Sequence, residues 1–427
     1  MVPKGWSESY LGEVVTYKKG YAFNSSLYAE EGIRIVRISD TTRDSIHSDN
    51  PVFIAGGNVE GLEQYSLFEN DIILSTVGSR PHLLDSMVGK AVKVPRSAHN
   101  SLLNQNLVKL IPKKTKITNE YLFSMLKKKE FIQFISNLVR GNANQVSITL
   151  ADLFKYKFIL PSLPEQKKIA QILSTWDKAI SVTEKLLTNS QQQKKALMQQ
   201  LLTGEKQLLD ENGVRFSGDW GKFTLSHFGK CIRGVSYKPE NICENESDNT
   251  IRLLRSTNIQ NGELNDKDLI ILPKKLVKPM QVLMDGDLAI CMANGSKSLV
   301  GKSAPYKPND ADYTVGAFCA LFRPLKSVSS SFVKFLFESN QYQSQLLVIL
   351  AGSSINNLKG SDIESINIDA PLHYKEQQKI AAVLSAADAE ISTLEKKLAC
   401  LKDEKKALMQ QLLTGKRRVK VDEAVAV

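Results

Sequence analysis

The sequence has 427 residues, 42% of them hydrophobic and 24% charged, and its 56 basic and 45 acidic residues leave a net charge of +11. This composition excludes a disordered or fibrous chain and suits roughly two to three globular units. The basic balance favours a polyanionic partner, most often nucleic acid. No apolar run approaches the ~18 residues of a membrane-spanning helix, and the first residues lack the features of a signal peptide, so we expect a cytoplasmic protein without membrane contact.

Residues 1–160 read as a first globular module. Short apolar or alternating runs, such as GIRIVRI, NDIILSTV, MVGKAVKV and NLVKLI, predict strands separated by turn residues. A helical stretch follows at Asn119–Leu138. The module is therefore predicted to be mixed α/β, with a curved sheet.

Residues 161–204 predict one long helix. Ser162-Leu163-Pro164-Glu165 has the form of a capping box with proline in the first turn, and Gly204 marks the end. Between them, positions alternately four and three residues apart form a seam that is mostly apolar: Ile169, Leu173, Trp176, Ile180, Thr183, Leu187, Ser190, Lys194, Leu197 and Leu201. A period of about 3.5 residues held this long is typical of a coiled coil.

The chain then repeats this design. A linker at 205–217 leads to a second module at 218–370, with a helical stretch at Ser331–Leu350, then to a second helix at 371–415 and a tail at 416–427. At a constant offset of 211 residues, 13 identities fall in 165–187 and 11 in 194–204, so 24 of 40 positions match, including KKALMQQLLTG letter for letter. The modules match more faintly, as in IRIVRISD with IRLLRSTN and VGKA with VGKS.

The second seam is even more apolar than the first: Ile380, Leu384, Ala387, Ile391, Leu394, Leu398, Leu401, Lys405, Leu408 and Leu412. Each stripe needs a partner to leave water, so we expect the two helices to pair within the chain as an antiparallel coiled coil, giving the fold a pseudo-twofold internal repeat. The alternative is that the helices join two chains. A lysine in each seam, Lys194 and Lys405, disfavours a generic sticky coil.

No catalytic or metal-binding pattern is present. GSKSLVGKS has one residue too many between its first two glycines for a phosphate-binding loop, and no G-x-G occurs. The five histidines and five cysteines show no metal-ligand or disulfide spacing. We expect no cofactor and no metal in this chain.

The helical motifs resemble a known family. LPSLPEQKKIAQILSTWDKAI, KEQQKIAAVLSAADAEI and the twin KKALMQQLLTG resemble the conserved helical regions of the specificity subunit of type I restriction-modification enzymes. The order module–helix–module–helix extends this resemblance over about 1–415. The modules themselves match only in pattern.

The resemblance implies a function. Each module would be a target recognition domain that reads one half of a split site on double-stranded DNA, and the coiled coil would fix the spacer. Two methyltransferase (M) subunits would dock on the chain and methylate adenine N6 with S-adenosylmethionine, and motor–nuclease (R) subunits would add ATP- and Mg²⁺-dependent cleavage. The chain itself would be non-catalytic. The alternative is a coiled-coil scaffold that spaces two binding modules without DNA specificity.

DNA contacts are predicted from basic and amide side chains at similar places in the two modules, because Arg reads guanine and Asn or Gln reads adenine. The first module offers Arg34, Arg37, Ser39, Asp40, Ser79, Arg80, Asn142, Asn144 and Gln145. The second offers Arg252, Arg255, Thr257, Asn258, Asn294, Ser296, Lys297, Asn356, Asn357 and Lys359. The alternatives are salt-bridged arginines and turns held by side-chain amides. For the methyltransferase subunits we predict contacts on exposed helix faces, or else a solvated flank, at Gln166, Lys167, Gln199 and Gln200.

Overall fold

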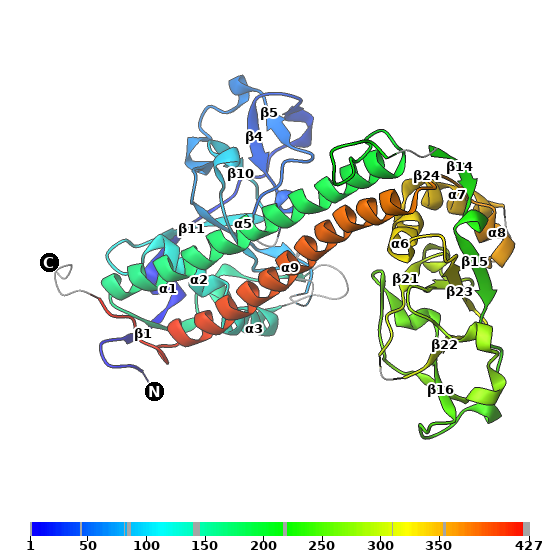
Figure 1. Cartoon of the computed structure of the whole chain (residues 1–427). Helices are drawn as coiled ribbons and strands as arrows, with labels where there is room; N and C mark the ends of the chain where they lie inside the picture. The colour runs from blue at the N-terminus through cyan, green and yellow to red at the C-terminus, as the bar shows by residue number, and fades with distance from the viewer. Residues whose placement is uncertain are drawn as a thin grey trace. The chain divides into compact units, whose positions relative to one another are not determined.

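The computed structural model describes residues 2–42, 45–80, 82, 87–139, 146–216, 220–309, 311–352 and 356–421. The chain divides into two compact units: Met1–Glu184 with Lys397–Val427 forms unit 1, and Lys185–Lys396 forms unit 2. The long helices α5 (Leu163–Leu202) and α9 (Tyr374–Leu412) each begin in one unit and end in the other (Figure 1). The unit borders therefore fall inside the helices rather than at residues 160 and 370. We call residues 1–160 module 1 and residues 218–370 module 2.

Module 1 is built from short strands and helices. Its strands are β1 Ser7–Tyr10, β2 Val15–Lys19, β3 Tyr28–Ala29, β4 Ile33–Val36, β5 Val52–Ile54, β6 Ser66–Leu67, β7 Ile72–Ser75, β8 Val77–Gly78, β9 Ala91–Lys93, β10 Ser101–Leu103, β11 Leu107–Pro112, β12 Val146–Ser147 and β13 Lys157–Leu160. Its helices are α1 Leu11–Val14, α2 Asn119–Leu126, α3 Lys129–Leu138 and α4 Leu150–Leu153, with 3₁₀ helices η1 Ser25–Leu27, η2 Ile38–Asp40, η3 Gly56–Asn58, η4 Glu63–Tyr65 and η5 Arg96–Ala98.

Module 2 has the same kind of elements. Its strands are β14 Trp220–Thr224, β15 Gly229–Arg233, β16 Thr250–Leu254, β17 Ile259–Gln260, β18 Glu263–Leu264, β19 Ile270–Pro273, β20 Leu288–Cys291, β21 Ser303–Pro305, β22 Tyr313–Val315, β23 Cys319–Pro324 and β24 Asn367–Pro371. Its helices are α6 Ser330–Glu338, α7 Asn340–Ala351 and α8 Gly360–Glu364, with 3₁₀ helices η6 Leu225–His227, η7 Pro239–Asn241, η8 Ser256–Asn258, η9 Lys274–Leu276, η10 Pro279–Gln281 and η11 Lys297–Leu299.

The strand order shows that the two modules are copies of one fold. Module 1 has a sheet ordered β2-β11-β7-β9, and module 2 has its counterpart ordered β15-β23-β20-β21. A second sheet contains β5-β4-β10 in module 1 and β19-β16-β22 in module 2, and in both the last pair is parallel. The strands that open and close each module also pair, β1 with β13 and β14 with β24. The mixed α/β internal repeat predicted from faint sequence similarity is confirmed.

Each predicted helical stretch is a pair of helices. The stretch at 119–138 breaks between α2 and α3, and the stretch at 331–350 breaks between α6 and α7. Ser339 explains the second break, because its hydroxyl accepts a hydrogen bond from the backbone N–H of Tyr342 (3.2 Å) and so caps a new helix. The helical pattern of the sequence did not reveal this local competition.

Each module shares its core with two helix ends. In unit 1, Ile169 and Leu173 of α5 and Leu412 of α9 pack in one cluster with Tyr121 and Phe131. In unit 2 the roles are exchanged, because Leu201 of α5 and Ile380 and Leu384 of α9 pack with Phe332 and Phe335. Every position of the two predicted seams is buried or half-buried. This joint burial places the unit borders within the helices.

Within both units α5 and α9 run antiparallel (Figure 1). In unit 1, Asp177 pairs with Lys405 and Glu184 with Lys402. In unit 2, the Ser190 hydroxyl donates to Glu390 (3.0 Å) and Lys194 pairs with Asp388. In each unit, a higher residue number on α5 pairs with a lower residue number on α9. This is the antiparallel pairing within one chain that the seams predicted.

The glycine stops follow the predicted signals, and the predicted capping-box residues contact each other through their side chains. The Ser162 hydroxyl donates to Glu165 at the start of α5 (3.2 Å). Gly204 and Gly415 follow the helices with φ of +76° and +70°, a conformation that favours glycine. A Cβ at Gly204 would lie 2.9 Å from the ring of Trp220, and one at Gly415 would lie 3.3 Å from the ring of Trp6. Each glycine thus ends a helix and seats the tryptophan that opens a module.

Candidate nucleic-acid interface

The predicted arginines lie on equivalent strand–turn motifs, β4 with η2 in module 1 and β16 with η8 in module 2. In both, the last residue of the turn bonds back to the backbone N–H of an arginine. Asp40 accepts from Arg37 and Asn258 accepts from Arg255, each at 2.8 Å. The same turn therefore ends the same strand in both modules, and the sequence alignment of these segments holds in three dimensions.

The turn-closing residues face inward. Asp40 is 2% exposed and forms an ion pair with Arg37 (2.9 Å), while Asn258 is 0% exposed. The Asn258 amide donates to the carbonyls of residues 265 and 267, at 3.1 and 2.7 Å. Asp40 and Asn258 thus shape the turns. Ser39 and Thr257, one residue earlier, are exposed and face outward.

The arginines are already engaged within their modules. Arg34 donates to the Ser48 hydroxyl (3.0 Å) and Arg255 to the carbonyl of residue 268 (2.6 Å). Arg252 binds Glu246 through two hydrogen bonds, at 2.9 and 2.8 Å, and lowers the pKa of that carboxyl. This agrees with the alternative of paired arginines on strands. A phosphate contact would require Arg252 to exchange one anion for another.

A second polar loop follows the buried strand β7 in module 1 and β20 in module 2. In module 1, β8 pairs with β12, and the carbonyl of Ser79 accepts from the N–H of Val88 (2.9 Å). Arg80 is exposed. In module 2, Ala293 pairs with Asn357 in the same manner. Asn142, Asn144 and Gln145, also predicted to bind DNA, lie outside the described residues.

In module 2 these loops meet. The Asn294 amide donates to the Ser256 hydroxyl (3.4 Å), and its backbone N–H donates to the carbonyl of Asn356 (3.3 Å). The Asn356 amide donates to the carbonyl of Gly295 (3.2 Å). We call residues 256–258, 293–299 and 356–359 the loop cluster. It carries exposed polar and basic side chains at the edge of the sheet: Thr257, Ser296, Lys297, Asn357 and Lys359.

In module 1 a buried lysine joins the corresponding segments. Lys90 is 5% exposed, and its ammonium donates to the carbonyl of Thr41 (2.8 Å), just after η2. The preceding residue, Gly89, donates its backbone N–H to the carbonyl of Ser75 at the end of β7 (2.8 Å). The turn with Ser39 and the loop with Ser79 and Arg80 are thereby held on one side of module 1.

A third turn belongs to this region, and the sequence analysis did not identify it. It joins β10 to β11 at residues 104–106 and β22 to β23 at residues 316–318. The carbonyl of Asn106 accepts from the N–H of Thr76 (3.0 Å), and that of Phe318 accepts from those of Met292 and Ala293 (2.9 and 3.1 Å). The turn has no sequence motif, because Asn106 and Phe318 differ chemically. Only superposing the strand order reveals the correspondence.

Gln166 is not on an exposed helix face, contrary to the prediction. It is 0% exposed, and its amide donates to the carbonyls of Pro161 and Lys116, both at 2.9 Å. Its oxygen accepts from the N–H of Thr118 (2.8 Å). Gln377 repeats this arrangement in unit 2. The glutamines are retained in both copies because they fasten each module to the start of a helix.

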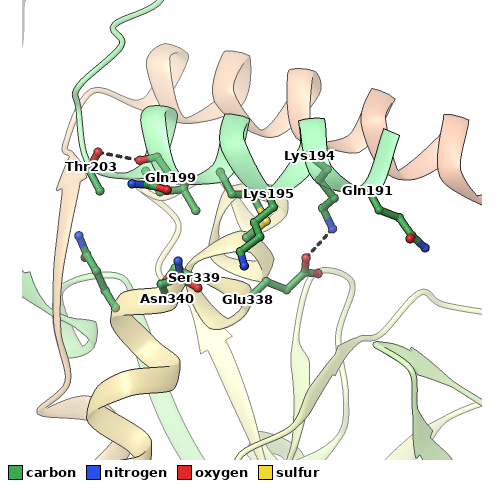
Figure 2. A pocket seen from close by; sticks show the side chains of 11 residues that line it. Gln191, Lys194, Lys195, Gln199, Thr203, Glu338, Ser339 and Asn340 are labelled. Atoms are coloured by element: carbon green, nitrogen blue, oxygen red, sulfur yellow. Dashed lines mark hydrogen bonds and ion pairs between the residues drawn. The ribbon is translucent and has the colours of Figure 1, made fainter. Parts of the chain in front are cut away.

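The other predicted partner residues, Lys167, Gln199 and Gln200, are exposed. Gln199 lines a cavity of about 250 Å³ between α5 and the junction of α6 with α7 (Figure 2). Lys194 points across this cavity to Glu338, with 2.8 Å between the charged atoms (Figure 2). The cavity is smaller than the ~300–1,000 Å³ of typical ligand sites, so we assign it to the joint between helix and module.

The described residues contain no group of acidic, histidine or cysteine side chains that could hold a metal ion. Burial raises the pKa of Cys231 and of Cys319 to about 12, so both thiols stay protonated at neutral pH and are poor nucleophiles. No described helix is long and apolar enough to cross a membrane.

Comparisons with known proteins identify the same repeat. The model of the type I restriction modification DNA specificity domain matches residues 3–189 and again 217–402. The EcoKI specificity subunit of Escherichia coli strain K12 is 36% identical over 46% of this chain and 42% of its own length. The StySPI specificity subunit of Salmonella potsdam is 33% identical over 46% of this chain and 43% of its own. The aligned part thus spans less than half the length of these two relatives.

Other proteins match over almost the whole chain. The putative MjaX specificity subunit of Methanocaldococcus jannaschii is 26% identical over 98% of this chain and 95% of its own. The crystal structure of the type I restriction-modification S subunit from M. genitalium has a TM-score of 0.59 at 15% identity, covering 96% of both chains. A chain from a structural study of complex assembly in the type I system has a TM-score of 0.54 at 19% identity, covering 98% and 100%. At such identities the structures support the fold alone. The double match to the domain model shows that the chain belongs to the type I restriction-modification DNA specificity family.

Proposed function

We propose that the chain is the DNA-recognition subunit of a type I restriction-modification complex. Each module would read one half of a bipartite site on double-stranded DNA, and the paired helices α5 and α9 would fix the spacer between the halves. The observation that carries this proposal is the combination of one sheet order with different loop side chains in the two modules. A repeated fold with divergent loops suits two readers that face different base sequences.

Other subunits of the complex would carry out the chemistry. Specificity subunits are generally non-catalytic, and this chain would scaffold two methyltransferase subunits and the motor–nuclease subunits in the cytoplasm. The partners would supply S-adenosylmethionine for adenine N6 methylation, and ATP with Mg²⁺ for restriction. Lys167, Gln199 and Gln200 are the exposed helix residues that we assign to methyltransferase contact, and Gln166 is withdrawn because it is buried.

In module 2 we assign DNA contact to the outward side chains of the loop cluster, above all Thr257, Ser296 and Lys297. In module 1 we assign it to Ser39, Ser79 and Arg80. Arg34, Arg37, Arg252 and Arg255 remain candidates for phosphate contact, because they lie beside these loops with internal partners that a phosphate could replace. The net charge of +11 supports this binding without specifying its sequence.

Mapping methylated adenines in a host with and without this gene tests the proposal. We expect one split sequence to lose methylation when the gene is absent. Binding of the reconstituted methyltransferase complex to that duplex should also weaken steeply with salt. A scaffold without DNA specificity would give an unchanged methylation map and salt-insensitive binding to protein partners only.

A further inference from the structure

The turns at residues 104–106 and 316–318 share one backbone structure. In both, the residue after the turn donates to the carbonyl of the first turn residue, Leu107 to Asn104 (3.0 Å) and Cys319 to Gly316 (2.8 Å). In both, the backbone N–H of the first turn residue donates to the carbonyl of the last residue of β4 or β16. Asn104 donates to Val36 (3.1 Å), and Gly316 donates to Leu254 (2.9 Å). The fold thus presents the third turn residue at the same place in each module.

This third residue is Asn106 in module 1 and Phe318 in module 2. Phe318 is 72% exposed, more than any other described aromatic side chain, although its neighbour Cys319 is 1% exposed. Solvating a phenyl ring forgoes about 1.5–3 kcal/mol of burial. The turn therefore holds an apolar ring in water, and its backbone adjoins the loop cluster because the carbonyl of Phe318 accepts from the N–H of Ala293 (3.1 Å).

A single exposed aromatic side chain needs no explanation by itself. Phe318 differs because it lies among side chains that suit polar contact with a duplex, and because its counterpart Asn106 has a different recognition chemistry. In the major groove, the apolar feature that distinguishes one base from another is the C5-methyl group of thymine, whereas an asparagine amide reads the N6 and N7 edge of adenine.

We propose that the third residue of this turn is a base-reading position, and that Phe318 contacts a thymine methyl group in the half-site of module 2. This inference rests on the proposed DNA-reading function. Asn106 occupies the same position in module 1 and reads a base edge through its amide. The pair gives the two modules different base preferences on a shared backbone.

The test uses the complete complex of this chain with its methyltransferase subunits. Each thymine of the module 2 half-site is replaced in turn by uracil, which removes only the methyl group. For the unaltered complex we expect one such replacement to weaken binding about 3- to 10-fold. Phe318→Ala should weaken binding to the thymine duplex by a similar factor and should be insensitive to uracil at that one position. Phe318→Leu, which keeps an apolar contact, should recover part of the affinity and part of the sensitivity.

Val214→Ala is the control, because Val214 is also exposed (59%) but lies in the linker. It should leave affinity and uracil sensitivity unchanged. If Phe318→Ala weakens all duplexes equally, impairs only subunit assembly, or leaves every uracil effect intact, the inference is wrong. If the unaltered complex shows no preference for a split sequence, the proposed function fails instead.

Discussion

In both units a tryptophan near the start of a module binds a glutamate at the start of a long helix, but the surroundings of the glutamate differ. In unit 1, Glu165 accepts from the indole N–H of Trp6 (3.0 Å) and also binds Arg418 of the segment after α9 (2.6 Å). In unit 2, Glu376 accepts from the indole N–H of Trp220 (3.0 Å), and its other oxygen is buried without a hydrogen-bond partner among the described residues. The joint itself is a tryptophan held by a helix-start glutamate. The arginine is an addition specific to one copy.

The comparison extends to the reading loops, where the difference is larger. The strand order is shared, yet the turn-closing residue is Asp40 in module 1 and Asn258 in module 2, and the half-buried Asn106 corresponds to the exposed Phe318. The two copies therefore share one backbone structure, although side chains differ at matched positions, including the turn-closing ones. Substitutions at matched positions should show which of these differences affect stability.

The largest expected effect comes from the shared scaffold. Leu173 and Leu384 occupy the same helix position in units 1 and 2 and are 1% and 0% exposed. Leu173→Ala and Leu384→Ala should each lower the free energy of unfolding by about 2–5 kcal/mol, because each leaves a cavity in a module core. Leu398→Ala, at a half-buried seam position, should cost less. Denaturant titrations measure all three, and a greater cost for Leu398→Ala would show that the cores do not include the helix ends.

Substitutions of the turn-closing residues should lower the free energy of unfolding by different amounts in the two copies. Asn258→Asp should cost about 1–3 kcal/mol, because a carboxylate cannot donate to the two carbonyls that the Asn258 amide now binds. Asp40→Asn keeps an acceptor for the backbone N–H of Arg37 and loses only part of an ion pair, so it should cost less. Thermal unfolding with each variant checks this order, and equal costs would mean that the Asn258 donors contribute nothing.

The two seam lysines, Lys194 and Lys405, differ in how many carboxylates they bind. Lys194 binds both Glu338 and Asp388, and although burial lowers the pKa of Lys194, these two carboxylates hold it above its ordinary value. Lys405 pairs with Asp177, whose side chain is 54% exposed. Lys194→Ala should therefore destabilise by about 1–2 kcal/mol, and Lys405→Ala by about 0.5 kcal/mol or less. A double-mutant cycle of Lys194 with Glu338 should show coupling, and its absence would remove the proposed role of this pair.

The glutamates that bind the two tryptophans come last, because the effect of substituting Glu376 should be the smallest. Glu165→Gln should cost about 1 kcal/mol, since it leaves Arg418 without its anion. Burial raises the pKa of Glu376 above its ordinary value of 4.5, against the hydrogen bond of Trp220 that lowers it. Because the folded state holds this proton more tightly than the unfolded state, the stability contributed by Glu376 falls as pH rises above 4.5 through the folded-state pKa. Glu376→Gln should abolish this pH dependence and slightly raise stability at pH 7. A pH series of melting temperatures in which both proteins change in parallel would contradict this account.

The scaffold could be predicted from sequence because its determinants are periodic or local. The seam residues and the glycine stops each act over a few helical turns, and both appear in the structure. The burial of Gln166 could not be predicted from sequence, because it depends on Lys116 and Thr118, which are distant along the chain. Its identity in both copies was a signal for a shared internal contact.

The candidate interface was less accessible to sequence reasoning. Arg252 and Glu246 form a bidentate pair that depends on how a loop folds back onto β16. Phe318 carries no motif, and its correspondence with Asn106 exists only through the order of strands in the sheet. Residues that face a partner vary by nature, so their positions emerge from the backbone that presents them.

A module exchange tests the central claim most directly. Residues 1–160 are replaced by the corresponding module of another family member, with Glu165 and Gln166 kept so that the helix start retains its fastening. Methylated adenines are then mapped in cells that express the chimera with its methyltransferase subunits. Independent readers predict that one half of the split site changes while the other half and the spacer stay the same. A change in both halves would contradict the account.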